Sequence, residues 1–297
     1  MELRQLRQVI VLAETLNFRR AAERLHMAQP PLSTSVKKLE EELGVQLFQR
    51  LPSGVKITPA GEVVLRHARR AVFFAEQTRR AGREGESGEQ GTLRLGFVGS
   101  ASYSLMPRVI RAFRRQYPRV DIVIDESTTI ELLRGVESHS LDVALVRFPV
   151  VEPTAAELTL LRAERLLAAV SSDSVLASLS SASLAELAQE PLIIYARHRV
   201  PAMYAFVMQA FAEARVQPRV AQEAVQVQHM LGLVESGLGF AFVPEACSRY
   251  AGDGVRLLAI EPEPTAFQVG LALASLPEAL TPTARNFIAV ARAEAGQ

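Results

Sequence analysis

The chain has 297 residues, of which nearly half are apolar, a formal net charge of +1 and one cysteine, Cys247. This length predicts two or three domains, with ample material for packed cores. A single cysteine excludes an internal disulfide and suits a reducing compartment. No apolar run approaches the roughly 20 residues that span a bilayer, and the first residues lack the core of a signal peptide, so we expect a cytoplasmic protein without a membrane partner.

Charge is unevenly distributed along the chain. Residues 1–91 carry 15 Lys and Arg against 11 Asp and Glu, whereas residues 92–297 carry 18 against 21. A net charge near zero says nothing by itself about a nucleic-acid partner. The basic part and the acidic part of the chain are nevertheless separated.

The first residues predict three short helices. Apolar side chains at helical spacing predict a helix over residues 3–13, and Asn17 is a suitable N-cap for a second helix over residues 18–25. A three-residue turn precedes a third helix, "QPPLSTSVKKLEEEL". Its side chains that face the small core are Leu32, Val36, Leu39 and Leu43. This spacing is that of a helix-turn-helix, whose second helix enters the major groove of DNA.

The third helix begins with two prolines, which lack an N–H that would be unpaired in a first turn and which fix the direction of the helix. Its outward side chains are expected to contact DNA: Gln29, Pro30, Ser33, Thr34, Lys37 and Lys38. Gln suits a bidentate contact with adenine, Ser and Thr bond base edges or phosphate, and Lys pairs with phosphate. The alternative is that the prolines only interrupt the chain and the lysines form a solvated surface.

Two short β-segments follow, "VQLFQR" and "VKIT", on either side of the turn "LPSG". They predict a two-stranded wing beside the helix-turn-helix. Arg50, Ser53 and Lys56 lie at its base and tip, where we expect them to touch the sugar-phosphate backbone.

A long helix is predicted over residues 59–84, with Thr58 as its cap and Pro59 in its first position. We expect it to have no partner in its own small domain and to pair with a second copy of itself. The stripe that would form this contact is Val64, Ala68, Ala71, Phe74, Ala75 and Thr78. Packing on the C-terminal part is the alternative. The segment "GREGESGEQG" then predicts a flexible hinge.

The stretch "LRQLRQVIVLAETLNFRRAAERLHMAQPPLSTSVKKLEEELGVQLFQR", followed by "ITPAGE", resembles the N-terminal domain of LysR-type transcriptional regulators. The resemblance implies a winged helix-turn-helix that binds double-stranded promoter DNA, a dimer through the linker helix and commonly a homotetramer. It also makes RNA polymerase a possible partner. In that family the positions matching Gln29, Pro30, Ser33 and Thr34 lie at the DNA.

The remaining residues alternate strands such as "TLRLGFVG", "DVALV" and "FAFVP" with helices. Two successive βα sets predict two doubly wound α/β lobes, an arrangement like that of periplasmic binding proteins. The strand "FQVGLAL" and the last helix are expected to return to the first lobe, with crossings near Arg165 and Thr265. The predicted domains are a DNA-binding domain at 1–58, a linker helix and hinge at 59–91, and an effector-binding domain at 92–297, with lobe I at 92–164 and 267–297 and lobe II at 165–266.

Ligands of open α/β sheets bind beyond the carboxyl ends of strands, where helix N-termini point. This rule gives the candidate effector site: Gly99, Ser100, Ala101, Thr128, Thr129, Arg197, His198, Val200, Pro201, Ala202, Met203, Val225, Gln226 and Phe267. Hydroxyls, helix N-termini and the Arg197/His198 pair suit a small carboxylate. The site also resembles the subgroup of the family that controls aromatic-compound degradation. That resemblance implies a co-inducer derived from an aromatic compound, or a dicarboxylate, and leaves its identity open.

Other interpretations remain. Ser100, Thr128 and Thr129 are also ordinary helix caps. Arg147, Arg162 and Glu164 could form an accessory anion site, although a surface salt bridge is favoured. The histidines show no ligand spacing, so we expect no metal and no cofactor. An enzyme using Ser100 and His198, a transporter's solute receptor, and a cytoplasmic carboxylate sensor or repressor without effector-dependent activation are the alternatives. We expect a regulator and no enzyme.

Overall fold

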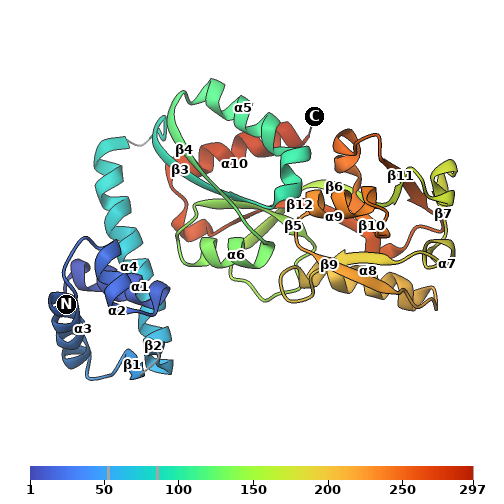
Figure 1. Ribbon diagram of the computed structural model, residues 1–297. Helices are drawn as coiled ribbons and strands as arrows, with labels where there is room; N and C mark the ends of the chain where they lie inside the picture. The colour runs from blue at the N-terminus through green and yellow to red at the C-terminus, as the bar shows by residue number, and fades with distance from the viewer. Residues whose placement is uncertain (52–53, 85–86, 297) are drawn as a thin grey trace. The chain divides into compact units, whose positions relative to one another are not determined.

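The computed structural model describes residues 1–51, 54–84 and 87–296, and the chain divides into two compact units, Met1–Gly85 and Glu86–Gln297 (Figure 1). The first unit holds four helices and a two-stranded sheet among its described residues. These elements are α1 Leu3–Thr15, α2 Phe18–Arg24, α3 Gln29–Leu43, β1 Phe48–Leu51, β2 Gly54–Ile57 and α4 Pro59–Glu84.

The predicted helix-turn-helix is confirmed as α2 and α3. Asn17 caps α2, because its Oδ1 accepts from the backbone N–H groups of Arg19 and Arg20 at 3.0 and 3.1 Å. Ala28 precedes α3, which has proline in its first turn and ends at Gly44, where a φ of +70° favours glycine. Three of the four side chains expected in the core are buried, whereas Leu43 is only half-buried in the last turn of α3.

The wing is the antiparallel pair of β1 and β2, in which Phe48 faces Ile57. The N–H of Val55 donates to the carbonyl of Leu16 at 3.1 Å, which ties the wing to the end of α1. Thr58 then caps α4 as predicted, since its Oγ1 accepts from the N–H of Gly61 at 2.9 Å.

The expectation that α4 has no partner in its own unit is wrong. Its first half packs on α1 and buries Leu65 and Ala68 in the core of the N-terminal unit. Ala68 therefore does not belong to an outward stripe. Val63 and Phe74 lie on the opposite side of the helix, where they are 46% and 43% exposed. The helix thus has two apolar sides, and α1 covers only one of them.

The second unit contains the remaining elements. Its described strands are β3 Gln90–Phe97, β4 Arg119–Glu126, β5 Val143–Phe148, β6 Glu157–Ser171, β7 Ser181–Ala182, β8 Leu192–Tyr195, β9 Val220–Ala224, β10 Phe240–Pro244, β11 Val255–Ile260 and β12 Gln268–Ser275. Its α-helices are α5 Met106–Gln116, α6 Thr129–Glu137, α7 Leu184–Leu187, α8 Pro201–Glu213, α9 Val227–Glu235 and α10 Pro282–Ala295. Short 3₁₀ turns are η1 Gly99–Tyr103, η2 Val175–Ser178, η3 Glu245–Tyr250, η4 Thr265–Phe267 and η5 Pro277–Ala279.

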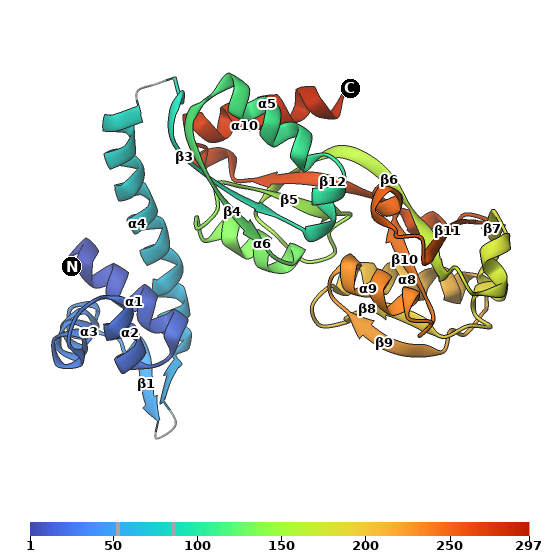
Figure 2. The same cartoon turned by 45° about the horizontal axis from the view of Figure 1, so that its top comes forward.

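Two lobes with separate cores make up this unit. In lobe I the strand order is β4-β3-β5-β12-β6, with β4, β3 and β5 parallel and β12 antiparallel to both of its neighbours. Helices α5 and α10 lie together on one face of this sheet and α6 on the other (Figures 1 and 2). In lobe II the order β9-β8-β10-β6-β11 repeats the pattern, since β9, β8 and β10 are parallel and β6 is antiparallel to β10.

Strand β6 belongs to both lobes. It pairs with β12 up to Arg165 and with β10 from Leu166, so the chain passes from lobe I to lobe II between these two residues. It returns where η4 ends at Phe267 and β12 begins at Gln268. β6 starts eight residues before Arg165, and α9 ends at Glu235, two residues before the left-handed Gly237.

Candidate functional site

The outward surface of α3 carries the side chains expected at DNA. Gln29, Pro30, Thr34, Lys37 and Lys38 are exposed, and Ser33 is half-buried. The hydroxyl of Thr34 donates to the carbonyl of Pro30 at 3.1 Å, and Lys37 pairs with Glu41 at 3.5 Å. Both contacts lie within one exposed helix, so neither holds its side chain strongly.

Among the described side chains of the wing, one is cationic, the exposed Lys56 on β2. Arg50 lies on β1, and its side chain lies outside the described part of the structure. Ser53 lies outside the described residues altogether.

A pocket lies between the two lobes of the second unit. Its open space is about 440 Å³, including the part open to solvent. Lobe I contributes Val98, Gly99, Ser100, Ser127, Thr128, Thr129 and Arg147, and lobe II contributes Tyr195, Val200, Met203, Val225, Gln226, Val227 and Pro244. The sequence predicted eight of these fourteen residues.

Three helices begin at the pocket. Their N-caps are Thr128 for α6, Val200 for α8 and Gln226 for α9, and all three residues line the cavity. The Oγ1 of Thr128 accepts from the N–H of Glu131, whereas no side chain caps α8 or α9. Converging helix N-termini give the cavity a positive potential that suits an anion.

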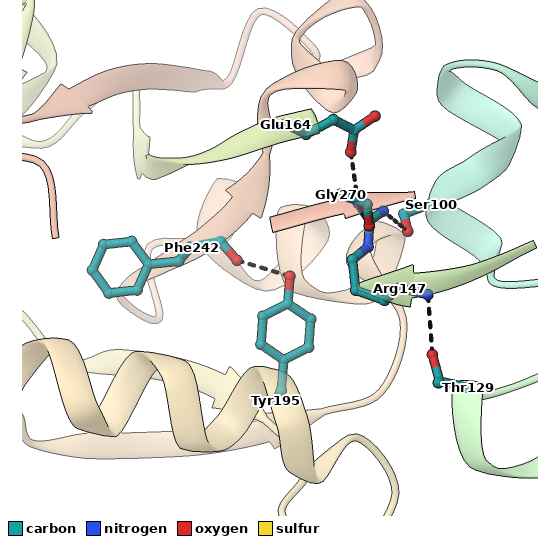
Figure 3. Close-up of polar contacts among 7 residues, drawn as sticks. All are labelled: Ser100, Thr129, Arg147, Glu164, Tyr195, Phe242 and Gly270. Carbon is teal, nitrogen blue, oxygen red and sulfur yellow. Dashed lines mark hydrogen bonds and ion pairs between the residues drawn. The ribbon is translucent and has the colours of Figure 1, made fainter. Parts of the chain in front are cut away.

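Arg147 is the cation of this pocket (Figure 3). Its Nη1 donates to Glu164 Oε2 at 2.6 Å and to the carbonyl of Gly270 at 3.3 Å, and its Nη2 donates to the hydroxyl of Ser100. The backbone N–H of Arg147 donates to the Oγ1 of Thr129 at 3.2 Å. One residue therefore contacts two hydroxyls that line the pocket, that of Ser100 on η1 and that of Thr129 at the start of α6.

The expectation of a surface salt bridge at this place is wrong. The side chains of Arg147 and Glu164 are 6% and 3% exposed, because β12 and η1 cover the pair. Arg162, two residues before Glu164 on β6, is exposed. Removal of one partner of a buried pair would leave an uncompensated charge in the interior.

Several predicted site residues do not line the pocket. Arg197 and His198 are exposed, and the guanidinium of Arg197 lies 5.7 Å from the ring centroid of Tyr204. Phe267 is fully buried in lobe II, where its ring lies 4.7 Å from that of Phe242. Ala101 is buried in the core of lobe I, and Pro201 and Ala202 start α8 without facing the cavity.

Six lining residues were missed as members of this site: Val98, Ser127, Arg147, Tyr195, Val227 and Pro244. One of them carried a signal in the sequence. Arg147 interrupts the apolar strand "VALVRF", and a charged residue at the end of a buried strand has to find a buried partner. Tyr195 ends the strand "LIIY", and its hydroxyl donates to the carbonyl of Phe242 at 3.0 Å.

Contacts between described side chains also join the two lobes. Arg199, before α8, pairs with Glu131 on α6 at 3.5 Å, and the rings of Tyr103 and Tyr250 lie 4.6 Å apart. The hydroxyl of Ser127 donates to Glu131 and, with a smaller contribution from Arg199, lowers the pKa of that carboxyl. Burial raises the pKa of Cys247, on η3, to about 12 and raises that of Tyr195 as well, so both stay neutral.

The geometry gives the enzymatic alternative no support. Ser100 holds its hydroxyl against Arg147, and His198 does not line the pocket. Within residues 1–51, 54–84 and 87–296, no group of three or more His, Cys, Asp or Glu could hold a metal ion. Over the same ranges, every helix is too short or too polar to cross a membrane.

Comparisons with known proteins agree with both units. Residues 3–62 match the bacterial regulatory helix-turn-helix protein family, lysR family, and residues 86–296 match the LysR substrate binding domain. The transcriptional regulator AlsR of Bacillus subtilis is 36% identical over 84% of this chain and 82% of its own length. The regulator BenM of Acinetobacter baylyi is 35% identical over 82% of this chain and 80% of its own.

Among solved structures, this chain is similar to full-length CbnR, a LysR family transcriptional regulator, in complex with its target DNA. The similarity covers 99% of this chain and 100% of the CbnR chain. The TM-score is 0.61 and the sequence identity is 27%. A DNA-reading unit, a bilobed ligand-binding unit and matches that cover most of the sequence converge on one identification. The chain belongs to the LysR family of DNA-binding transcriptional regulators.

Proposed function

We propose that this regulator senses a small organic carboxylate in the pocket between its lobes and changes its hold on promoter DNA in response. The buried guanidinium of Arg147, with the hydroxyl of Ser100 beside it, carries this proposal. A carboxylate accepts charge-assisted hydrogen bonds from such groups and is stabilised by the start of α6. AlsR and BenM are named as transcriptional regulators, which supports the part of the proposal that concerns promoter DNA.

The lobes are joined by two crossing strands, so a ligand that touches both lobes favours their closed arrangement over an open one. Residues from both lobes line the pocket, which meets this condition. No covalent chemistry is required of the pocket, so we propose no catalytic activity, no metal and no resident cofactor. The effector itself is the only small molecule in the proposal.

The DNA-reading unit acts in pairs in this proposal. The exposed side of α4, with Val63 and Phe74, would pack against the same side of a second copy and set the distance between two recognition helices. Two such dimers would form a tetramer, and RNA polymerase would be the partner that responds to it. Because the proposed target is promoter DNA, we propose that the protein acts in the cytoplasm.

The test is selection of duplexes from a random pool by the full-length protein, followed by footprinting with and without butyrate or benzoate. We expect an interrupted dyad whose half-sites are about one helical turn or more apart, and a footprint or bend that changes with the acid. Failure to enrich any duplex at low salt would overturn DNA binding. A footprint unchanged by saturating acid would overturn the sensing role.

A further inference from the structure

The pocket holds one cation, and that cation is already paired. Among the described lining residues, Arg147 is the only cationic side chain, and Glu164 balances its charge at 2.6 Å. Glu164 and Gly270 accept from Nη1, and Ser100 accepts from Nη2, which leaves Nε–H and the second Nη2 hydrogen for a ligand. This end of the pocket therefore suits one anionic group.

A carboxylate of the protein lies beside the positive end of α9. A Cβ added to Gly99 would lie 2.6 Å from Glu126 Oε1 and 2.7 Å from Gln226 Oε1, so these side chains, from different lobes, meet over Gly99. Gln226 is the N-cap of α9, and Glu126 is the last residue of β4. Glu126 thus occupies the neighbourhood in which a second anionic group of a ligand would find the start of α9.

The start of α8 likewise offers little to a second anionic group of a ligand. Its first helical residue is Pro201, which has no N–H to offer, and the nearby cation Arg199 is paired with Glu131. The other lobe II residues at the pocket are apolar, apart from Gln226 and from Tyr195, whose hydroxyl is committed to Phe242. Lobe II therefore presents a largely apolar wall flanked by two carboxylates of lobe I.

We infer that the pocket selects a monocarboxylate over the dicarboxylate with the same carbon chain or aromatic ring, and that Glu126 is a specificity-determining residue for this choice. The inference rests on the proposed carboxylate-sensing function and narrows its ligand class. The single carboxylate binds at Arg147 and Ser100, and the apolar remainder of the ligand packs against Val200, Met203 and Val227. On the lobe II side, a second carboxylate would lie among apolar side chains or beside Gln226 and the neighbouring Glu126.

The experiment is isothermal titration of the full-length protein near neutral pH with two matched pairs of acids, butyrate with succinate and benzoate with terephthalate. We expect each monocarboxylate to bind at least about tenfold more tightly than its partner, the equivalent of about 1.4 kcal/mol. Glu126 is exposed, so water and salt screen its charge. Glu126→Gln is therefore expected to lower the ratio of monocarboxylate affinity to dicarboxylate affinity by about two- to fivefold.

Asp121→Asn is the matched control. It removes the same charge from the same strand, and Asp121 is exposed about 16 Å from Glu126 along β4. The ratio of monocarboxylate affinity to dicarboxylate affinity should be unchanged in Asp121→Asn. Both substitutions are at exposed positions, and circular dichroism confirms that each variant is folded.

The outcomes separate this inference from the function on which it rests. A dicarboxylate that binds as tightly as its monocarboxylate overturns the inference and leaves carboxylate sensing intact. A ratio that Glu126→Gln leaves unchanged overturns the role of Glu126. If none of the four acids binds, the proposed function fails and the inference fails with it.

Discussion

Arg147 and Glu164 form an ion pair of 2.6 Å that is buried beneath the pocket. Glu164 lies on β6, just before the residues at which this strand passes from lobe I to lobe II. Arg147 contacts Ser100 at the pocket from the other end of the same guanidinium. The pair therefore links the hydroxyl of Ser100, which lines the pocket, directly to the strand that joins the lobes (Figure 3).

Loss of one partner of this pair should be costly. Arg147→Met leaves a buried carboxylate without its counter-ion, and we expect it to lower the free energy of unfolding by about 3–5 kcal/mol. The double variant Arg147→Met/Glu164→Leu should regain much of this loss, because it removes both charges. Urea unfolding of the full-length protein, followed by circular dichroism, measures both. If the loss in the double variant equalled the sum of the losses in Arg147→Met and in the single variant Glu164→Leu, the two charges would not be coupled.

Lys37 is expected to contact phosphate, so Lys37→Ala should weaken binding to all duplexes alike. The slope of log affinity against log salt should fall by about one, because one fewer counterion is released. Fluorescence anisotropy over a salt series gives this slope. Arg256→Ala, which removes an exposed cation from β11 in lobe II, is the control and should leave the slope unchanged.

Gln29→Ala should behave differently, because Gln29 is expected to contact a base. We expect it to lower discrimination against the wrong base pair at one position by about 1–3 kcal/mol and to leave the salt slope unchanged. Anisotropy with single-base variants of the selected duplex measures this. Equal losses on all duplexes would place Gln29 at the phosphate backbone instead.

Phe74 is expected to lie in the contact between two α4 helices. Phe74→Glu would place a charge in that apolar contact, so the dissociation constant of the dimer should rise by at least about a hundredfold. Analytical ultracentrifugation measures it. Val175→Glu alters a side chain that is 86% exposed on η2 in lobe II and should have no effect. An unchanged dimer in Phe74→Glu would show that copies associate through another surface.

Through their contacts with Glu131, Ser127 and Arg199 make the stability of the protein depend slightly on pH in the acid range. The Ser127 hydroxyl, with Arg199, holds the pKa of Glu131 below its ordinary value. The stabilisation is therefore present at neutral pH and lost as the pH falls through the folded-state pKa. Ser127→Ala should raise this pKa in a ¹³C NMR titration and lower stability by less than about 1 kcal/mol at neutral pH, since Glu131 is nearly half exposed. A stability difference that persists in strong acid would assign the effect to something other than this carboxyl.

Local signals made the N-terminal unit predictable. The caps at Asn17 and Thr58 and the periodicity of α3 depend on residues a few positions apart, and all three are observed. The stripe on α4 was only half understood, because apolar spacing does not say which side of a helix another element of the same unit covers. Leu65 and Ala68 pack inward for that reason.

The pocket was harder to predict, because its organising contacts are distant in sequence. Arg147 finds Glu164 and Gly270, which lie 17 and 123 residues away. The rule that ligands bind at strand ends pointed to the edge of both sheets at which the pocket lies. The rule does not give the direction of side chains, so it wrongly included Phe267 and Arg197. Phe267 is buried in the core of lobe II, and Arg197 lies over the ring of Tyr204 outside the cavity.

The most direct measurement compares the dissociation constant of benzoate for the free protein with that for the protein saturated with its selected duplex. If carboxylate binding and DNA binding are coupled, the two constants differ by the factor by which benzoate changes DNA affinity. That factor is about 5- to 150-fold for typical coupling energies. Benzoate that binds both forms with the same constant would contradict the coupling.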